Sequence, residues 1–428
     1  MRQEQTRTYG DAPGERPDRA SLQTERRQTL GTKVFAAEKL LLARMMESLG
    51  NPPLRLVLWD GQEIACADRA PIARVVIRDR GAMLKLIANP ELGFGEMYTA
   101  DRIDVRGNLV ECLDAIYRAL PRPEQGQIGQ KLLAPFNGKR RNGISGARRN
   151  VQHHYDIGND FYKLWLDREM VYTCAYFPSP ALGLEEAQVA KLDYVCRKLR
   201  LAPGETVVEA GCGWGALALH MAKFYGVQVK AYNISKEQIV YARERACSEG
   251  LEDRVDFIED DYRNIAGEFD AFASVGMLEH VGTDHYRELG AVIDRSLKAA
   301  GRGLIHSIGR DYPSPMTPWI ERNIFPGACP PSLSQMTQIF EPFGFSVLDV
   351  ENLRLHYAKT LEHWLARYEG AIERVATMYD PAFARAWRLY LAGSVAAFKS
   401  GAMQLFQVTF TRSGENRIPW TRQYLYPS

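Results

Sequence analysis

Residues 207 to 238, VVEAGCGWGALALHMAKFYGVQVKAYNISKEQ, contain a glycine-rich turn between an apolar run and a helical pattern. Gly211, Gly213 and Ala216 match G-x-G-x-x-[GA], a fingerprint of loops that hold the pyrophosphate of a dinucleotide. Glu209 precedes this turn by two residues, at the end of the apolar run. Its carboxylate would repel a pyrophosphate but attract an ammonium or sulfonium group, so the turn is predicted to bind a cationic ligand.

The next two strand-like runs are also followed by polar residues. Asn233 stands where a nicotinamide dinucleotide site would need an acid for the ribose, and with Gln238 it offers neutral hydrogen bonds. Gln238 also completes a capping box, Ser235-x-x-Gln238, that would start the next helix. Asp261 and Tyr262 could meet the amino group and ring face of an adenine, although a surface loop is the commoner explanation for an isolated Asp-Tyr pair. S-adenosylmethionine therefore suits the turn better than a dinucleotide, and we expect a methyltransferase.

Charge and composition exclude several other classes. The formal net charge of +2 over 428 residues argues against a dedicated nucleic-acid-binding protein. The seven cysteines are scattered and form no C-x-x-C pair, which argues against a disulfide framework or a zinc site. The histidines lack metal-ligand spacing with carboxylates, so no metal is predicted. No apolar run is long enough to span a bilayer and the charged N-terminus does not resemble a signal peptide, so we expect a cytoplasmic protein.

From about residue 200, strand-like and helical patterns alternate. This alternation is typical of a mostly parallel sheet covered by helices on both faces, so the fold class predicted is α/β. The strand candidates are TVVEA, VQVKAY, RVDFI, FDAFASVG, GRGLIHSIG, FSVLDVE and LFQVTFTR. Ligands of such sheets bind beyond the carboxyl ends of the strands. The residues at or just after such ends are Glu209, Asn233, Asp261, Glu279 and His306.

The first 150 residues are expected to form three parts. Residues 1–32 are polar and are predicted to be disordered, whereas residues 33–120 mix helical and strand patterns and predict a small α+β domain. The buried face of its first helix is expected to hold Val34, Ala37, Leu41, Met45 and Leu49, with Glu38 off that face. Residues 121–150 are rich in Pro, Gly and basic residues. They are either a solvated linker or a contact for anionic phospholipid headgroups.

Several motifs occur together in a specific order. They are HYDIGNDFYKLWLDREMVYTCAYF, EAGCGWG, VGMLEHVG, LIHSIG and NIFPGACPPS. In these motifs the chain resembles the cyclopropane fatty acid synthase family, which includes the mycolic acid cyclopropane synthases, over about residues 150 to 412. The resemblance implies a class I S-adenosylmethionine-dependent methyltransferase with a Rossmann-like, seven-stranded sheet over residues 151–428. The stretch PELGFGEMYTADRIDVRGNL is similar to the small N-terminal domain of longer bacterial members, and its ending resembles a sterol-carrier type of lipid-binding fold.

The resemblance also implies a reaction. A methyl group passes from S-adenosylmethionine to a cis double bond of a phospholipid acyl chain, and the resulting carbocation loses a proton to close a cyclopropane ring. Aromatic faces such as that of Tyr172 would stabilise the cation. In the family the base is a bound bicarbonate, whose ligands correspond here to backbone groups of Cys174 and Ile308 and to the side chains of Glu279, His306 and Tyr357.

The positions that the resemblance and the strand ends together assign to the methyl donor are Tyr172, Thr173, Glu209, Gly211, Gly213, Asn233, Ile234, Gln238, Asp261 and Tyr262. Plainer explanations exist for single residues: Cys174 as a core residue, His306 as a hydrogen-bonded strand histidine and Glu279 as a helix cap. His280 is expected to face away from the site if its segment is extended.

Three positions depart from the family pattern: Asn233, Leu278 and Pro330. The last two are expected near the acyl channel, where they bear on the product. Alternatives to a cyclopropane synthase are therefore a C-methyltransferase that forms methylene or methyl branches, a non-catalytic lipid-binding protein and a small-molecule methyltransferase. The partners expected are unsaturated phospholipid chains and anionic headgroups at the inner face of the membrane, with a homodimer possible and no nucleic acid.

Overall fold

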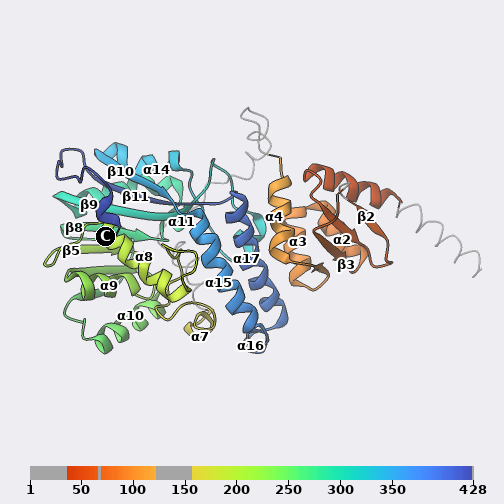
Figure 1. The fold of residues 1–428 in the computed structure, drawn as a ribbon, viewed down its shortest axis with the longest axis horizontal. Coiled ribbons are helices and arrows are strands. Elements are labelled where there is room, and N and C mark those ends of the chain that lie inside the picture. Colours follow the sequence, from red (N-terminus) through yellow and green to blue (C-terminus); the bar gives the residue numbers. More distant parts are fainter. Residues whose placement is uncertain (1–35, 66–68, 122–156, 427–428) are drawn as a thin grey trace, which may run out of the picture.

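The computed structural model describes residues 36–65, 69–121 and 157–426, which form two sheets and their covering helices (Figure 1). The predicted disordered tail, 1–32, lies outside the described residues. So does the predicted linker, 121–150, apart from its first residue.

The larger sheet has seven strands in the order β10-β11-β9-β8-β5-β6-β7. Neighbours from β9 to β7 are parallel, whereas β11 is antiparallel to both β9 and β10. The strands are β5 (Thr206–Ala210), β6 (Gln228–Asn233), β7 (Val255–Glu259), β8 (Phe269–Val275), β9 (Leu297–Gly309), β10 (Phe345–Asn352) and β11 (Gln404–Arg412). All seven predicted strands are present, and the α/β class is confirmed.

Helices cover both faces of this sheet. On one face, α8 (Leu184–Lys198), α9 (Ala216–Tyr225) and α10 (Lys236–Glu249) bury their apolar sides against β5, β6 and β7. On the other face, α12 (Tyr286–Ser296) and α14 (Leu333–Phe340) pack against β8, β9 and β11. Because both faces are covered, the central strands read as continuous apolar runs.

C-terminal helices form a further layer beside the sheet (Figure 1). They are α15 (Arg354–Gly370), α16 (Ile372–Met378) and α17 (Pro381–Ser400). Helix α17 begins at Pro381 after Asp380, whose side chain accepts a hydrogen bond from the backbone N–H of Phe383. With the short helix α7 (Asn159–Tyr162), α15 and α17 enclose a core rich in aromatic rings.

The N-terminal sheet has the order β2-β1-β3-β4, with β1 (Leu54–Val57), β2 (Glu63–Ala65), β3 (Ala73–Ile77) and β4 (Ile103–Arg106). Its helices are α2 (Arg80–Ala88), α3 (Pro90–Thr99) and α4 (Leu109–Ala119). Both α3 and α4 pack against α17, and Tyr98, Leu109 and Leu113 belong to the same aromatic-rich core as the C-terminal helices. Gly95 of α3 lies so close to Trp319 that an added Cβ would come within 2.3 Å of the indole. The two parts therefore share a packed interface.

The buried face of the first helix, residues 36–48, differs from the prediction. Leu42 and Met45 are buried, as is Glu38, whereas Leu41 is 45% exposed. The prediction is right for Met45, and it is wrong for Ala37 and Leu41, which are exposed, and for Glu38, which it placed off the core; Val34 lies outside the described residues. Glu38 can be buried because its carboxylate accepts a hydrogen bond from the guanidinium of Arg80 at 2.6 Å.

In the described part of the chain, no helix is long and apolar enough to cross a membrane. The same residues contain no group of three or more His, Cys, Asp or Glu side chains placed to hold a metal ion.

Candidate active site

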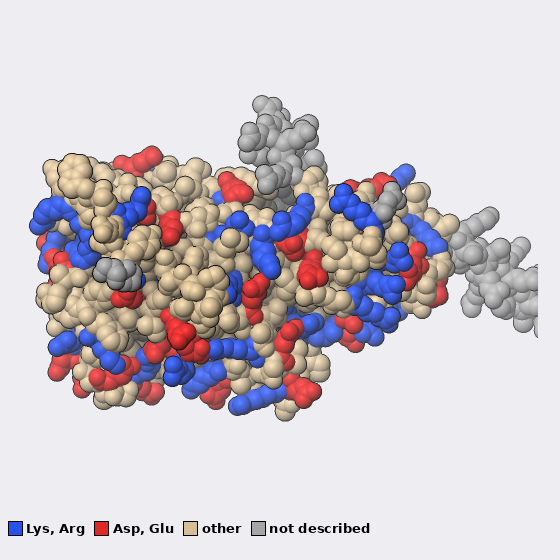
Figure 2. All heavy atoms as spheres, viewed as in Figure 1, with Lys and Arg blue, Asp and Glu red and all other residues tan. Residues whose placement is uncertain are grey.

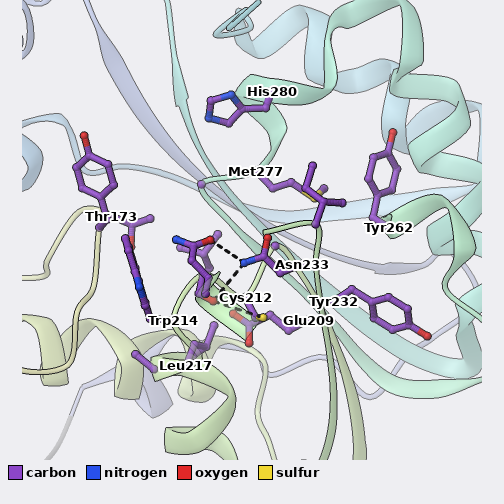
Figure 3. A pocket seen from close by; sticks show the side chains of 18 of the residues that line it. Thr173, Glu209, Cys212, Trp214, Leu217, Tyr232, Asn233, Tyr262, Met277 and His280 are labelled. Carbon is purple, nitrogen blue, oxygen red and sulfur yellow. Dashed lines mark hydrogen bonds between the residues drawn. The ribbon is translucent and has the colours of Figure 1, made fainter. Parts of the chain in front are cut away.

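A pocket lies at the carboxyl ends of β5, β6 and β8, with about 1090 Å³ of atom-free space including its open mouth. All ten positions expected to contact the methyl donor line it: Tyr172, Thr173, Glu209, Gly211, Gly213, Asn233, Ile234, Gln238, Asp261 and Tyr262. Figure 3 shows Thr173, Glu209, Asn233 and Tyr262 of this set around one space, together with Trp214, Met277 and His280. This is the edge of a parallel sheet where ligands bind.

The glycine turn forms one wall of this pocket. Gly211 and Gly213 have φ angles of +87° and +54°, which favour glycine. A Cβ on Gly211 would lie 2.9 Å from Cβ of Met277, whereas a Cβ on Gly213 would meet nothing within 4 Å. The backbone N–H groups of Gly211 and Cys212 both donate to the carbonyl of Tyr232, which fixes the turn against β6. The turn can therefore bring its backbone close to a ligand at Gly213.

Two opposite charges are buried at the pocket. Glu209 is 2% exposed, and within the described residues its Oε2 has no hydrogen-bond partner. Burial raises the pKa of this carboxyl to about 8. Lys191 of α8, also 2% exposed, donates from Nζ to Thr173 Oγ1 at 3.0 Å, and burial lowers its pKa to about 8. A ligand cation would favour the ionised form of Glu209. Lys191 was not among the predicted site residues, because its only signal in the sequence is a basic residue among apolar positions of a helix.

Asn233 and Gln238 bind each other. Nδ2 of Asn233 donates to Oε1 of Gln238 at 2.8 Å and to the carbonyl of Gly213 at 3.2 Å (Figure 3). Only half of the predicted capping box forms, since Ser235 accepts from the N–H of Gln238 while its own N–H donates to Asn233. The pair therefore links β6, the glycine turn and the start of α10.

Asp261 is held by a cation. Its carboxylate accepts from Nη1 of Arg263 at 3.1 Å, and Arg263 also donates to Glu288 at 3.0 Å. Tyr262 is buried beside it with its ring 4.9 Å from the Arg263 guanidinium, and burial raises the pKa of its phenol. An adenine amino group could still reach the free lone pairs of a carboxylate anchored in this way.

The segment from Val275 to Val281 separates this pocket from a second group of residues. Its last four residues form α11 (Leu278–Val281). His280 lines the donor pocket, as do Met277 and Val281, and its ring lies 5.9 Å from that of Phe325. Burial lowers the pKa of His280 to about 4. The expectation that His280 faces away was wrong because the segment is helical rather than extended, so residues 277, 280 and 281 share one face.

Glu279 lies on the other side of α11, against β9. Its Oε1 accepts from the backbone N–H of Ile308 at 2.5 Å, and its own carbonyl accepts from the N–H of Cys329 at 2.7 Å. Glu279 is 5% exposed, its Oε2 has no hydrogen-bond partner among the described residues, and burial raises its pKa to about 7. The structure thus brings Glu279 and Ile308 together, but the N–H of Ile308 is engaged by the carboxylate.

His306 lies two residues before Ile308 on β9 and is 1% exposed. Burial lowers its pKa well below the usual value, so the ring is neutral. Its Nδ1 lies 3.0 Å from Nε2 of Gln407, which can only donate; Nδ1 therefore accepts and Nε2 carries the proton. This Nε2 has no partner in the described part of the chain. A buried donor on β9 and a buried acceptor on α11 are thus both without a hydrogen-bond partner among the described residues.

Cys174 and Tyr357 lie together at the start of α15. The thiol of Cys174 is fully buried, 3.1 Å from the carbonyl of Ala175 and 3.9 Å from that of Leu353, and burial raises its pKa. Tyr357 is 6% exposed, and its ring centroid is 4.6 Å from that of Phe398. The thiol is therefore a packed side chain rather than a nucleophile. The ring of Tyr357 packs with Trp364 of α15 and Phe398 of α17.

Aromatic rings connect the donor pocket with the core. The hydroxyl groups of Tyr172 and Tyr390 are 2.8 Å apart, and the ring of Tyr390 is 5.5 Å from that of Phe325. Tyr172 also contacts the rings of Trp165 and Trp364 at 5.2 and 5.4 Å. Trp364 and Tyr390 come from α15 and α17, and the sequence analysis did not find them.

All three departures from the family pattern, Asn233, Leu278 and Pro330, are buried. Leu278 is fully buried and packs in the core formed by α12, α14 and β8, not in the aromatic-rich core. Pro330 is buried in the loop before α14. Any influence of Leu278 on the reacting chain is therefore transmitted through α11.

Comparisons with known proteins agree with this geometry. The family model described as mycolic acid cyclopropane synthetase matches residues 144–408, and a domain of unknown function matches residues 41–121. The chain is 38% identical to cyclopropane-fatty-acyl-phospholipid synthase of Escherichia coli (strain K12) over 363 residues, covering 83% of this chain and 92% of the relative. It is 36% identical to a probable fatty acid methyltransferase of Pseudomonas putida over 395 residues, covering 87% and 96%. The crystal structure of mycolic acid cyclopropane synthase CmaA1 complexed with SAH and CTAB superposes with a TM-score of 0.60 at 30% identity, covering 62% of this chain and 98% of that one.

The seven-stranded sheet, the pocket beyond its carboxyl ends and the superposition with CmaA1 together identify an S-adenosylmethionine-dependent methyltransferase. The matched family model covers more than half of the chain and agrees with this class. The chain belongs to the mycolic acid cyclopropane synthetase family, and the predicted family resemblance is confirmed.

Proposed function

We propose that this enzyme transfers a methylene group from S-adenosylmethionine to cis double bonds of phospholipid acyl chains and so forms cyclopropane rings. The observation that carries the proposal is the position of α11. This helix places His280 at the polar donor pocket and holds Glu279 against β9, the strand that carries His306, and Glu279 Oε2 and His306 Nε2 are buried without a partner among the described residues. Methyl transfer and proton removal then occur at neighbouring positions.

On the donor side, the chain binds and orients S-adenosylmethionine. Glu209 attracts the positive end of the donor, while Asn233, Gln238 and Asp261 offer hydrogen-bond partners to its nucleoside. The double bond attacks the methyl carbon as the sulfur–carbon bond breaks, which leaves a carbocation on the acyl chain. Tyr172, packed between tryptophans, presents an aromatic face near this charge.

On the other side, the chain holds a proton acceptor. When bound, bicarbonate supplies the base that removes a proton from the added methyl group. His306 Nε2–H would donate to it and Glu279 Oε2 would accept from its hydroxyl, since both atoms are buried and unused. The N–H of Ile308 would donate to the bicarbonate only as a hydrogen bond shared with Glu279, which already accepts from it. The contacts of bicarbonate with the backbone of Cys174 and with the side chain of Tyr357 also remain part of this proposal.

The substrate is proposed to be reached at a membrane surface. Figure 2 shows basic and acidic side chains interspersed over the visible face, so the described surface of this view has no extended patch of one sign. Docking of the N-terminal part and of the basic residues 131–149 on anionic lipid is expected to weaken with salt. Vesicle binding that is unchanged between low and high salt would contradict this part of the proposal.

A second product has specific support. The relative of P. putida carries the name of a fatty acid methyltransferase, and residues at Leu278 and Pro330 depart from the cyclopropane pattern. Loss of a different proton from the same carbocation would give a methylene branch.

The test is the acyl product. Purified protein is incubated with S-adenosylmethionine and liposomes of cis-unsaturated phospholipid, and the chains are analysed by mass spectrometry with a test for double bonds. Gain of CH2 with loss of the double bond is expected. The same gain with a double bond retained would establish the branching reaction instead, and no gain would leave only a lipid-binding protein.

A further inference from the structure

Arg310 lies at the end of the strand that carries His306, with no carboxylate within ion-pair distance among the described residues. Its Nη1 donates to Ser314 Oγ at 2.5 Å and its Nη2 to Met316 Sδ at 3.5 Å, while its Nε is shielded from solvent without a partner. A guanidinium has five N–H donors, so most of them are unused here.

The surroundings of Arg310 make an unpaired charge unfavourable. The residue is half-buried, and burial lowers its pKa, although a guanidinium stays protonated in proteins. Tyr117 of α4, Cys329, Tyr312 and, more weakly, the carboxylate of Glu91 lie close enough to interact electrostatically with it, but none of them forms an ion pair with the guanidinium within the described residues. Charges at such places are normally paired, so an anion from outside the described residues would complete this site.

The place of Arg310 in the sheet points to the origin of that anion. Alternate residues of a strand face the same side, so His306, Ile308 and Arg310 form one row along and just beyond β9. At about 3.3 Å per residue, Arg310 Cα lies roughly 13 Å from His306 Cα. Ile308, Phe325 and Tyr117 pack against the aromatic-rich core along this row. Apolar and aromatic side chains therefore lie between the buried imidazole and Arg310, which is near the end of α4.

We propose that Arg310 binds the phosphate of the phospholipid substrate while a double bond of its acyl chain lies beside Glu279 and His306. This assignment rests on the proposed function for the identity of the acyl chain. The planar guanidinium suits a phosphodiester because it can donate two parallel hydrogen bonds to it. The distance along the row then selects double bonds at a limited range of positions from the headgroup.

The kinetic test compares two substrates in the same mixed micelles: dioleoyl phosphatidylglycerol and the phosphate-free monoolein. Arg310→Met is expected to raise KM for the phospholipid by about tenfold and to leave the kinetics with monoolein unchanged. Arg310→Lys keeps the positive charge but cannot donate two parallel hydrogen bonds, so its KM for the phospholipid should lie between those of the wild type and of Arg310→Met. The matched control is Arg322→Met, which removes an exposed arginine that pairs with Glu96 at the same junction and should change neither substrate. Equal slowing on both substrates would show that Arg310 only holds the turn through Ser314, and an unchanged phospholipid KM would also overturn the assignment.

A binding measurement separates this inference from the proposed function. Dihexanoyl phosphatidylglycerol, kept below its micelle concentration, is titrated calorimetrically into wild type and into the Arg310→Met variant. Binding lost in the variant supports the phosphate site even if the wild type forms no methylated product, in which case only the proposed function fails. Equal binding to both proteins overturns the site. Inorganic phosphate is titrated in parallel, and binding as tight as that of the lipid would assign the site to free phosphate instead.

Discussion

The two sides of α11 differ in how their polar groups are satisfied. On the donor side, Asn233 is bonded to Gln238 and Asp261 to Arg263 before any ligand arrives. On the other side, Glu279 Oε2 and His306 Nε2 are buried and have no partner in the described chain. Most polar groups of the donor pocket are thus held by its own contacts, with Glu209 Oε2 left for a cationic ligand, whereas the buried acid and the buried imidazole of the second group both need a polar partner. This difference separates binding from proton transfer, and it can be tested residue by residue.

The largest effect is expected from His306→Ala. Loss of the buried imidazole donor should lower kcat about 10²- to 10⁴-fold, the range typical of a group that acts in proton transfer. The affinity for S-adenosylmethionine should not change, because His306 does not line the donor pocket. Steady-state kinetics and calorimetric titration check both statements. Gln407→Leu removes the amide that donates a hydrogen bond to His306 and fixes its tautomer, so it should cause a smaller loss of kcat. Weaker binding of S-adenosylmethionine in either variant would contradict the separation of donor binding from proton transfer.

Glu209→Gln should act only on the donor side, with a loss of affinity for S-adenosylmethionine of about tenfold or more. The pKa of Glu209 is raised to about 8 in the folded protein, so its protonated form stabilises the fold fully below about pH 4.5, and this contribution is lost as the pH rises through 8. A bound cation offsets that loss, so the rise in Tm on adding S-adenosylmethionine should be larger at pH 8 than at pH 6.

Thermal unfolding with and without the donor at the two pH values measures this dependence. The Glu209→Gln variant serves as the control, since it has no carboxyl to titrate and should show the same shift at both. An identical dependence in the variant would assign the titration to another group, such as Lys191.

The donor pocket could be predicted from the sequence because its residues follow successive strands. Once the strands are assigned, Glu209, Asn233 and Asp261 must meet at one edge of the sheet, whatever the loops do. His280 could not be placed in this way. Its side depends on whether four residues form a helical turn or an extended segment, and the difference rotates the side chain to the opposite face.

The aromatic lining was not predictable for another reason. Trp364 and Tyr390 contact Tyr172 although they lie about 190 to 220 residues later in the chain, on helices whose apolar residues read as ordinary core. Glu38 shows the same limit, since only the position of Arg80 makes its burial possible. Pairings of this kind depend on tertiary contacts that local patterns do not encode.

The two glycines of the turn offer a matched pair with moderate effects. Gly211→Ala should lower the free energy of unfolding markedly, because its Cβ would lie 2.9 Å from Met277 in addition to the strain of a positive φ. Gly213→Ala adds only the backbone strain, about 1 kcal/mol, but places a methyl group at the pocket wall. Chemical denaturation should therefore show the larger loss of unfolding free energy in Gly211→Ala. Titration with S-adenosylmethionine should show the weaker donor binding in Gly213→Ala. Equal unfolding free energies would show that Met277 moves aside.

The smallest effect is expected from His280→Ala. The imidazole is neutral at assay pH because burial lowers its pKa to about 4, so only contacts are lost. The KM for S-adenosylmethionine should rise a few-fold, by less than about tenfold. His285→Ala, on the same stretch but away from the pocket, should have no effect. A loss of kcat as large as that of His306→Ala would place His280 in proton transfer rather than in donor binding.

The most direct test is a single comparison on Glu279→Gln: calorimetric titration with S-adenosylmethionine alongside turnover on cis-unsaturated phospholipid liposomes. The amide keeps the size of the side chain and removes its capacity to take up or relay a proton. We expect a Kd equal to that of the wild type and turnover reduced by about 10²-fold or more. Unchanged turnover, or a Kd that rises in proportion to the loss of turnover, would contradict the assignment of Glu279 to proton transfer rather than to donor binding.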